Sequence, residues 1–369
     1  MGIKARFEPQ LDSNVYFIAE QGKPRLGFSK NRTQREIDYL SVPLSVHICI
    51  TNRCNLECSH CYAREFINTS NEESIEGSIN SLLDMLARNN VFVIEWSGGE
   101  PFMASQFIDI VEYANSLGFY QGIITNGTLN NAMEFERIKK TNTSLEISLD
   151  GDEFSVDTIK GIGVYKKVMN TVTLCRENNI PHIVKITILN ENIDSLYSAL
   201  STLIIGGVSN IKLGLLLPVG GASTVDYEQY IEHTIPKAKD IIRQVRKESG
   251  NRANIISPFD ASKKQIAPMS RRALLCEAGM TRLFIDNNGD CYPCPLFKTF
   301  SEFCAGNILH DTLSTIWSSR VMQDFRAINP RVTGCESCSV LCGFWCRAIA
   351  YAYSNNIAAK SILCQKIER

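Results

Sequence analysis

The sequence predicts an α/β fold in which six strand–helix units form a partial, open-sided barrel, followed by a smaller cysteine-rich domain. Residues 44 to about 235 alternate short apolar runs with amphipathic segments, as expected for strands joined by helices. Nine of the fourteen cysteines lie between residues 276 and 369, which marks that segment as a separate unit.

Six apolar runs are predicted as strands. The run 91–94 is apolar on both faces, which is typical of a buried parallel strand. Right-handed βα crossovers then give a parallel sheet, and six units are fewer than the eight of a closed TIM barrel. The functional site is expected at the carboxyl ends of the strands. The predicted strands are 44–50, 91–96, 120–125, 145–149, 183–189 and 211–217.

Helices between these strands are predicted from apolar residues that recur every three or four positions. Each stripe covers one face of a helix that packs on the sheet. The three stripes are Ile75, Ile79, Leu82, Leu83 and Leu86; Phe107, Ile108, Val111 and Ala114; and Val164, Val168, Met169 and Val172.

Length and composition indicate a globular protein with several parts. The 369 residues are 44% hydrophobic and 21% charged, and the net charge of -1 gives no reason to expect nucleic acid or an anionic membrane as a partner. We expect an N-terminal extension (1–43), a barrel (44–235), a linker of helix and loop (236–275) and the cysteine-rich domain (276–369).

No segment is expected to export or anchor the chain. The N-terminus lacks an apolar signal core. The most apolar stretch, 200–222, is interrupted by Asn210, Lys212 and Pro218, so it is predicted as a core helix followed by a core strand. The protein is therefore expected in the cytoplasm, where clustered cysteines hold metal more often than disulfides.

Three cysteines follow the first predicted strand directly. Cys54, Cys58 and Cys61 are separated by three and then two residues, and no fourth cysteine is near. Iron–sulfur cubanes are normally held by four thiolates, so three leave one iron free to bind a substrate or cofactor. A structural zinc site with His60 as fourth ligand is the alternative, but its ligands are more crowded than in the usual zinc spacing.

This triple-cysteine spacing followed by Tyr62 resembles the signature of the radical S-adenosylmethionine (SAM) superfamily. The resemblance implies that the unique iron chelates the amino and carboxylate groups of SAM. An electron from the cluster then cleaves SAM to a 5′-deoxyadenosyl radical, which abstracts hydrogen from the substrate. Such an oxidoreductase uses an external electron donor of the flavodoxin or ferredoxin type. The chain itself binds and orients the cofactor and the substrate and excludes other reactants from the site.

Motifs at the next strand ends agree with this resemblance. Gly98 and Gly99 let the backbone approach a ligand closely, and the Glu100 carboxylate can accept hydrogen bonds from an ammonium group. The triplet resembles the family's methionine-binding motif. Asn126 ends the third strand, and Ser148 lies near the end of the fourth. Both resemble family segments that contact SAM, although turns at strand ends explain them too.

Three further positions are predicted to contact SAM by the same resemblance. Asp150 belongs with Ser148 to the segment that contacts the ribose. Lys160 occupies a position where the family usually has arginine, and it lacks the planar fork that grips a carboxylate bidentately. Leu189 would lie near the adenine, although core packing explains this residue equally well.

The C-terminal cysteines resemble the SPASM extension, a domain with two auxiliary clusters. The likeness covers the cysteine spacing, a tight Asn288-Gly289 turn within a predicted hairpin (283–290), and the segment 306–308. It implies that one auxiliary cluster is bound by Cys276, Cys291, Cys294 and Cys346 and the other by Cys335, Cys338, Cys342 and Cys364.

Three cysteines remain outside these sets. Cys49 and Cys175 lie in apolar patterns and are predicted to be buried. Cys304 is an alternative to Cys291 as a ligand of the first auxiliary cluster. A zinc ribbon would leave several of the nine C-terminal cysteines unexplained, so three [4Fe–4S] clusters are expected.

The resemblance to SPASM enzymes favours a peptide maturase that oxidises or crosslinks a ribosomally made precursor (a RiPP maturase). Only about 43 residues precede the barrel, so a separate leader-peptide recognition protein is a possible partner. The alternative is an oxidoreductase or decarboxylase for a small molecule such as a sugar, nucleoside or tetrapyrrole.

Overall fold

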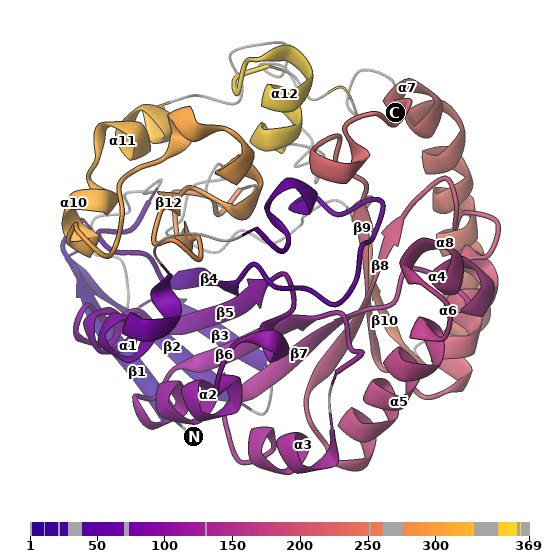
Figure 1. Cartoon of the computed structure of the whole chain (residues 1–369), viewed down its shortest axis with the longest axis horizontal. Helices are drawn as coiled ribbons and strands as arrows, with labels where there is room; N and C mark the ends of the chain where they lie inside the picture. The colour runs from indigo at the N-terminus through magenta and orange to yellow at the C-terminus, as the bar shows by residue number, and fades with distance from the viewer. Residues whose placement is uncertain are drawn as a thin grey trace.

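A computed structural model describes residues 2–10, 12–20, 23–28, 39–69, 74–129, 131–250, 252–260, 276–327, 346–359 and 362. A ring of helices surrounds one large sheet, and the C-terminal segments lie over one part of its rim (Figure 1). The described part of the chain contains no helix that is both long and apolar enough to cross a membrane.

The six predicted barrel strands are confirmed, with bounds that differ by at most two residues. They are β4 (Ser45–Thr51), β5 (Val93–Gly98), β6 (Tyr120–Thr125), β7 (Thr143–Ser148), β8 (His182–Ile188) and β9 (Asn210–Leu215). Neighbours in this series pair in parallel, as the right-handed crossovers predict. Their carboxyl ends therefore meet at one rim.

Three further strands extend this sheet to nine. β10 (Asn254–Ile256) pairs with β9, β11 (Arg282–Ile285) pairs in parallel with β4, and β12 (Cys291–Tyr292) pairs antiparallel with β11. The order is β10-β9-β8-β7-β6-β5-β4-β11-β12. Residues predicted as a linker thus supply an edge strand, and the start of the cysteine-rich segment continues the barrel sheet. The predicted turn at Gly289 joins β11 to β12, with φ of +89° at that residue.

Helices cover the outer face of the barrel sheet (Figure 1). The three predicted apolar stripes fall on α1 with its preceding 3-10 turn, on α2 and on α5. The barrel helices are α1 (Ile79–Arg88), α2 (Phe107–Ser116), α3 (Ala132–Ile138), α4 (Glu153–Lys160), α5 (Val164–Glu177), α6 (Leu196–Ile205), α7 (Tyr227–Gln229) and α8 (Ile235–Ser249). In the C-terminal region lie α10 (Leu313–Trp317), α11 (Arg320–Ala327) and α12 (Arg347–Ser354).

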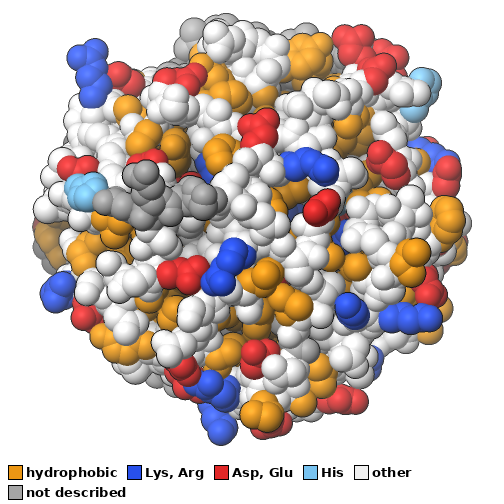
Figure 2. All heavy atoms as spheres, in the orientation of Figure 1, with side chains coloured by type: hydrophobic (Ala, Val, Ile, Leu, Met, Phe, Trp, Pro, Cys, Tyr) orange, Lys and Arg blue, Asp and Glu red, His pale blue; other side chains and the backbone are white. Residues whose placement is uncertain are grey.

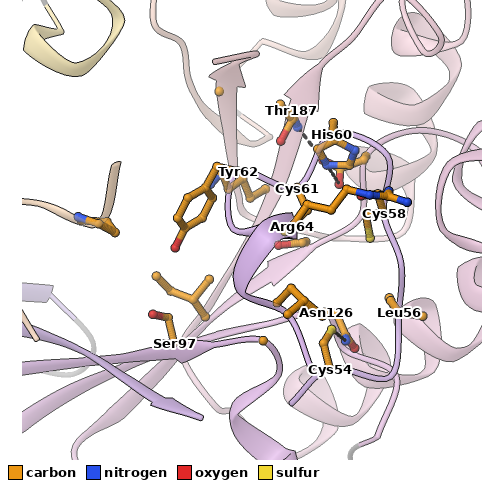
Figure 3. A pocket seen from close by; sticks show the side chains of 18 of the residues that line it. Cys54, Leu56, Cys58, His60, Cys61, Tyr62, Arg64, Ser97, Asn126 and Thr187 are labelled. Carbon is orange, nitrogen blue, oxygen red and sulfur yellow. Dashed lines mark hydrogen bonds and ion pairs between the residues drawn. The ribbon is translucent and has the colours of Figure 1, made fainter. Parts of the chain in front are cut away.

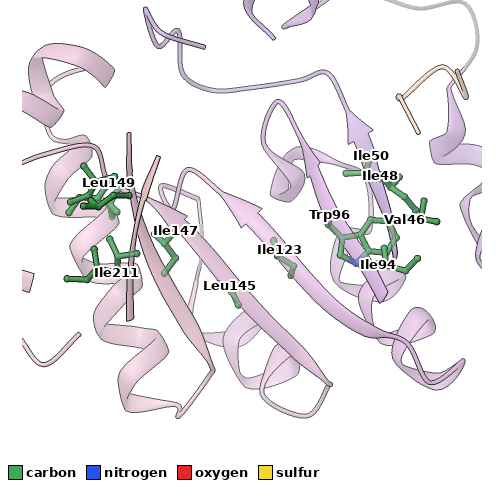
Figure 4. Packing of buried hydrophobic residues seen from close by; sticks show 14 of the residues in the cluster. Val46, Ile48, Ile50, Ile94, Trp96, Ile123, Leu145, Ile147, Leu149 and Ile211 are labelled. Carbon is green, nitrogen blue, oxygen red and sulfur yellow. The ribbon is translucent and has the colours of Figure 1, made fainter. Parts of the chain in front are cut away.

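The main core lies between the sheet and these helices. Val46, Ile94, Trp96, Ile123 and Ile147 come from four neighbouring strands and are completely buried (Figure 4). Burial of one such side chain stabilises the fold by roughly 1.5–3 kcal/mol, so this layer fixes the strand register. The predicted burial of Cys49 and Cys175 is confirmed, at 4% and 0% exposure.

The N-terminal extension forms an antiparallel sheet of β1 (Gly2–Glu8), β2 (Ser13–Glu20) and β3 (Lys23–Phe28). Phe17 of β2 packs against Phe92 and Tyr120, which lie where β5 and β6 begin. The Arg6 guanidinium donates hydrogen bonds to the carbonyl oxygens of Val42 and Pro43, just before β4. This sheet therefore covers the amino ends of the barrel strands, opposite the expected site.

Charged side chains of both signs are scattered over the face drawn in Figure 2, without a large patch of one sign. This agrees with the near-zero net charge of the sequence.

Candidate functional site: a cavity at the carboxyl ends of the barrel strands

The three cysteines that follow β4 line one cavity of about 720 Å³. In Figure 3 Cys58 and Cys61 lie on one side and Cys54 on the other. Within the described residues, no three His, Cys, Asp or Glu side chains are close enough to share one metal ion. Cys54, Cys58 and Cys61 are the cysteines on the wall of this cavity. Three thiolates on one iron–sulfur cluster would leave one iron open to a further ligand.

Burial controls the protonation of these thiols. It raises the pKa of the Cys58 thiol to about 11, and it also raises the pKa values of Cys54 and Cys61. Without metal all three are therefore protonated at neutral pH. A soft, positively charged centre would displace these protons, because thiolate rather than thiol is the ligand form.

The cysteine loop is held in place by close backbone contacts. Gly221, which follows β9, donates a hydrogen bond from its N–H to the carbonyl oxygen of Cys61 (2.9 Å). A Cβ atom at Gly221 would lie 2.2 Å from the carbonyl oxygen of Ser59, and one at Gly99 would lie 2.2 Å from that of Arg53. Glycine is therefore required at both positions. Gly99 was predicted in the site, whereas the Gly220-Gly221 pair was missed.

Glu100 lies behind the glycines and not on the cavity wall. Its carboxylate accepts hydrogen bonds from the Thr125 hydroxyl and the Asn126 N–H, both at 2.7 Å. Burial raises the pKa of Glu100 to about 7, although these hydrogen bonds act in the opposite direction. Glu100 thus ties the end of β5 to the end of β6, and its contact with SAM stays a prediction.

Asn126 is on the cavity wall, as predicted. Its side-chain amide donates hydrogen bonds to the Asn55 side-chain oxygen (2.9 Å) and to the Cys54 sulfur (3.9 Å). A hydrogen bond to a ligand sulfur stabilises negative charge there, so Asn126 is placed to act on a cluster through Cys54. Gly98 and Tyr62 also line the cavity.

Asp150 and Lys160 form a buried ion pair beside the cysteine loop. Nζ of Lys160 lies 2.9 Å from Oδ2 of Asp150 and donates a hydrogen bond to the carbonyl oxygen of Ser148 (2.7 Å). Burial opposes ionisation of Asp150, but Lys160 and His60 hold its pKa well below the ordinary value. Ser148, Asp150 and Lys160 all line the cavity, whereas Leu189 is buried in the core and does not.

The sequence suggests His60 only as a zinc ligand. Its Nε2 lies 3.4 Å from Oδ2 of Asp150, and its buried Nδ1 has no hydrogen-bond partner in the described protein. A buried polar nitrogen without a partner is rare and costs roughly 1–3 kcal/mol. The His60 ring therefore forms part of the cavity wall, with Nε2 directed to Asp150 and Nδ1 shielded from the open space.

Several residues on the barrel strands also line the cavity and were not predicted as site residues. They are His47 on β4, Lys185 and Thr187 on β8 and Lys212 on β9. The signal was present in the sequence, because charged residues alternate with apolar ones along strands that are otherwise core. Pro295 and Leu296, which follow Cys294, complete the wall from the C-terminal region.

Cys276, Cys294 and Cys346 pack around the same small apolar cluster in the C-terminal region. Phe284, Tyr292 and Phe297 belong to this cluster. Burial raises the pKa of Cys346 to about 11 and also raises those of Cys276 and Cys294. These three predicted ligands of the first auxiliary cluster are thus brought together in one apolar environment.

Cys291 lies apart from these three. Its side chain belongs to the main core with Ile285 and Ile308, and its sulfur is near the Gly289 carbonyl oxygen (3.5 Å). Residues alternate between faces along a strand, so Cys291 and Tyr292 point in opposite directions. Cys304 packs against the apolar cluster of Cys276 and Cys294. The predicted ligands Cys335, Cys338, Cys342 and Cys364 lie outside the described residues.

Comparison with known proteins places these features in a family. Residues 48–203 match the model of the radical SAM superfamily, and residues 276–339 match that of the SPASM iron–sulfur cluster-binding domain. The chain is 30% identical over 291 residues to the sporulation killing factor maturation protein SkfB of Bacillus subtilis, covering 76% of this chain and 67% of SkfB.

A second relative is the antilisterial bacteriocin subtilosin biosynthesis protein AlbA of Bacillus subtilis, 28% identical over 293 residues. This match covers 75% of the chain and 60% of AlbA. The crystal structure of Streptococcus suis SuiB bound to the precursor peptide SuiA has the same fold, with a TM-score of 0.72 at 16% identity. That likeness covers 89% of this chain and 77% of SuiB. The chain thus spans about two thirds or less of the length of the two curated relatives.

Proposed function

Because the chain belongs to the radical SAM superfamily and carries a SPASM domain, we propose that it is a maturase that oxidises or crosslinks a ribosomally made peptide. The observation that carries this proposal is the cavity at the carboxyl ends of the strands, which is lined by all three cysteines of the loop. The similarity to SkfB and AlbA, whose names refer to maturation of a killing factor and biosynthesis of a bacteriocin, supports a peptide substrate.

The residues present fit an iron–sulfur cluster and SAM. The three thiols line one cavity and are suitable ligands for iron, and His60, Asn126 and Asp150 line the same cavity as polar groups beside them. Bound together, the cluster and SAM supply a 5′-deoxyadenosyl radical that removes hydrogen from the substrate. We propose Cys54, Cys58 and Cys61 as the ligands of this cluster.

The protein's own part is to position and enclose these groups. Asn126 donates toward the Cys54 sulfur, and Lys160 keeps Asp150 ionised next to His60. We propose Tyr62, Gly98, Gly99, Ser148 and Asp150 as SAM contacts because each lines the cavity. Pro295 and Leu296 close one side and help to exclude water from the reacting groups.

We further propose two auxiliary [4Fe–4S] clusters in the C-terminal region. The shared apolar environment of Cys276, Cys294 and Cys346 supports one of them. The other rests on the sequence spacing of Cys335, Cys338, Cys342 and Cys364 alone.

The first experiment tests the catalytic cluster. Cys54, Cys58 and Cys61 are replaced together by alanine, and the protein is purified anaerobically. We expect no 5′-deoxyadenosine from SAM and dithionite, while iron in the C-terminal region is retained. Cys175→Ala is the matched control, because this cysteine lies on the buried face of α5 and does not line the cavity. Continued 5′-deoxyadenosine formation by the triple variant would refute the ligand assignment.

The second experiment tests the substrate class. The enzyme is co-expressed with short peptides encoded beside its gene, and the masses of the peptides are measured by mass spectrometry. A maturase removes hydrogen pairs, so a corresponding mass loss is expected that disappears in the triple variant. An active enzyme that cleaves SAM but leaves every such peptide unchanged would favour the small-molecule alternative.

A further inference from the structure

Two lysines at the bottom of the cavity share a single carboxylate. Lys185 on β8 and Lys212 on β9 are partners in the parallel register, and both line the cavity. Nζ of Lys212 lies 2.8 Å from Oε2 of Glu146 on β7, and Nζ of Lys185 lies 3.5 Å from Oε1 of the same residue. Two ammonium groups therefore face one carboxylate.

The other charged groups near the cavity balance one another more closely. Asp150 pairs with Lys160, and at the cavity mouth Glu57 and Arg64 contribute opposite charges. Burial lowers the pKa of His47 to about 3, so this side chain is neutral at physiological pH. Among the protein's side chains other than the cluster cysteines, the lysine pair thus leaves about one positive charge on the cavity wall.

Glu95 lies on β5, which pairs with β4 and β6, and does not cancel that charge. Its carboxylate contacts Arg282 on β11 at 3.0 Å. The same guanidinium is also 2.8 Å from Glu277, whose side chain is 57% exposed and faces solvent. Glu95, Arg282 and Glu277 together carry one excess negative charge, and water screens it because Glu277 faces solvent. Glu146, in contrast, is only 16% exposed.

The lysines are accessible although their strands lie inside the sheet. Their side chains are 33% and 44% exposed, while β8 and β9 each have a strand on both sides. Gly214 follows Lys212 by two residues on the same face and lines the cavity without filling it. A Cβ atom there would lie 3.5 Å from Cε of Lys185, in ordinary van der Waals contact, so the stem of Lys185 runs alongside Gly214. A ligand can therefore reach the ammonium groups.

A purely structural role explains this arrangement less well. One lysine suffices to neutralise Glu146, and the pKa of that carboxylate is lowered because both lysines outweigh the effect of burial. Holding a second ammonium group in a partly enclosed cavity costs desolvation and side-chain entropy. A second anion that enters the cavity would offset this cost.

We infer that Lys185 and Lys212 form an anion subsite that binds a carboxylate of the substrate. This inference rests on the proposed function, in which the substrate is a peptide. The carboxylate belongs either to an aspartate or glutamate side chain or to the C-terminus of the peptide. Its binding would orient the segment to be oxidised beneath the cysteine loop, since positioning of this kind accelerates a reaction without direct contact to the reacting atoms.

The test is lysine footprinting of the cluster-loaded, SAM-bound full chain by reductive methylation and mass spectrometry. The probes are N-acetylglutamate α-amide for a side-chain carboxylate and N-acetylglycine for a C-terminal one. N-acetylglutamine α-amide is the neutral isostere. At about ten times its Kd, an anionic probe is expected to slow labelling of Lys185 and Lys212 roughly tenfold. Lys166, whose side chain is 79% exposed on α5, is the control lysine and should label at an unchanged rate.

Protection by N-acetylglutamate α-amide indicates a side-chain carboxylate, and protection by N-acetylglycine indicates a C-terminal one. Equal protection by the neutral isostere would overturn the subsite. The inference would also be wrong if SAM alone gave full protection, because the lysines would then belong to the cofactor. In the Glu146→Gln variant we expect stronger protection, since the competing carboxylate is gone. The wild-type footprint remains decisive if that variant does not fold.

Failure of this inference is distinguishable from failure of the proposed function. A peptide that is modified equally well after every Asp and Glu is replaced by its amide and the C-terminus is amidated would overturn the subsite alone. An enzyme whose lysines are protected by the anionic probes, but which modifies no encoded peptide, would overturn the peptide substrate alone.

Discussion

The ammonium group of Lys298 lies 2.7 Å from the carboxylate of Asp286, and both side chains are more than nine-tenths buried. Lys298 also donates a hydrogen bond to the side chain of Asn52 (3.1 Å), which directly precedes the cysteine loop region. The sulfur of Cys49 lies 3.5 Å from the same Asn52 oxygen. This pair therefore links the C-terminal region to the end of β4, where the cysteine loop begins.

Lys298→Met is expected to destabilise the protein strongly. The change leaves Asp286 buried without its counter-charge, which typically costs about 3–5 kcal/mol. Urea unfolding of the iron-loaded protein measures this loss. The double variant Lys298→Met with Asp286→Asn should recover most of the stability, because no charge remains buried. Equal stability of the single variant and the wild type would contradict the structural role of the pair.

Glu100→Gln is expected to change how stability depends on pH. Glu100 has a pKa of about 7 in the fold against 4.5 for the ordinary value, so the folded state binds its proton more tightly than the unfolded state. Its stabilising contribution is complete below about pH 4.5 and is lost as the pH rises to about 7. The shift corresponds to roughly 3 kcal/mol.

The measurement is the difference in unfolding free energy between wild type and Glu100→Gln at several pH values. Other carboxylates titrate in both proteins and cancel in this difference. The wild type should lose stability relative to the variant between about pH 4.5 and 7. A constant difference over this range would mean that Glu100 is ionised throughout.

Gly221→Ala is expected to displace the cysteine loop. Its Cβ would lie 2.2 Å from the Ser59 carbonyl oxygen, so backbone must move. A displacement of about 1 Å at a catalytic site can cost on the order of 10²-fold in rate. We expect reduced iron content and a loss of this order in 5′-deoxyadenosine formation. Gly77→Ala is the control, because no atom lies within 4 Å of its Cβ position. Similar activities of the two variants would argue against the close contact.

Cys294→Ala and Cys291→Ala are expected to differ in iron content. Cys294 packs with Cys276 and Cys346, so its loss should remove about one cluster's iron. Cys291 lies in the main apolar core, and we expect its alanine variant to retain that iron. Iron and sulfide analysis of the anaerobically purified proteins provides the comparison. Loss of iron from both variants would assign Cys291 as a ligand.

Much of the architecture follows from local sequence. The six barrel strands were predicted to within two residues, because a buried parallel strand needs a short apolar run and the stripes on α1, α2 and α5 recur at the helical period. The cysteine loop is equally local, since its three thiols are set by a spacing of a few residues. These features depend on the chemistry of neighbours along the chain.

Contacts between distant segments were decided by the tertiary structure alone. The pairs Lys298–Asn52 and Gly221–Cys61 join residues far apart in sequence, and nothing in either segment identifies its partner. The linker strand β10 was missed because it has only three residues and gains stability by pairing with β9. The shared carboxylate of Lys185 and Lys212 likewise exists only because the sheet register aligns β7, β8 and β9. The sequence by itself determined the strands, the helices and the thiol spacing. The register and the packing between segments decided which charges meet in the cavity, because electrostatic interactions depend on distance in space rather than along the chain.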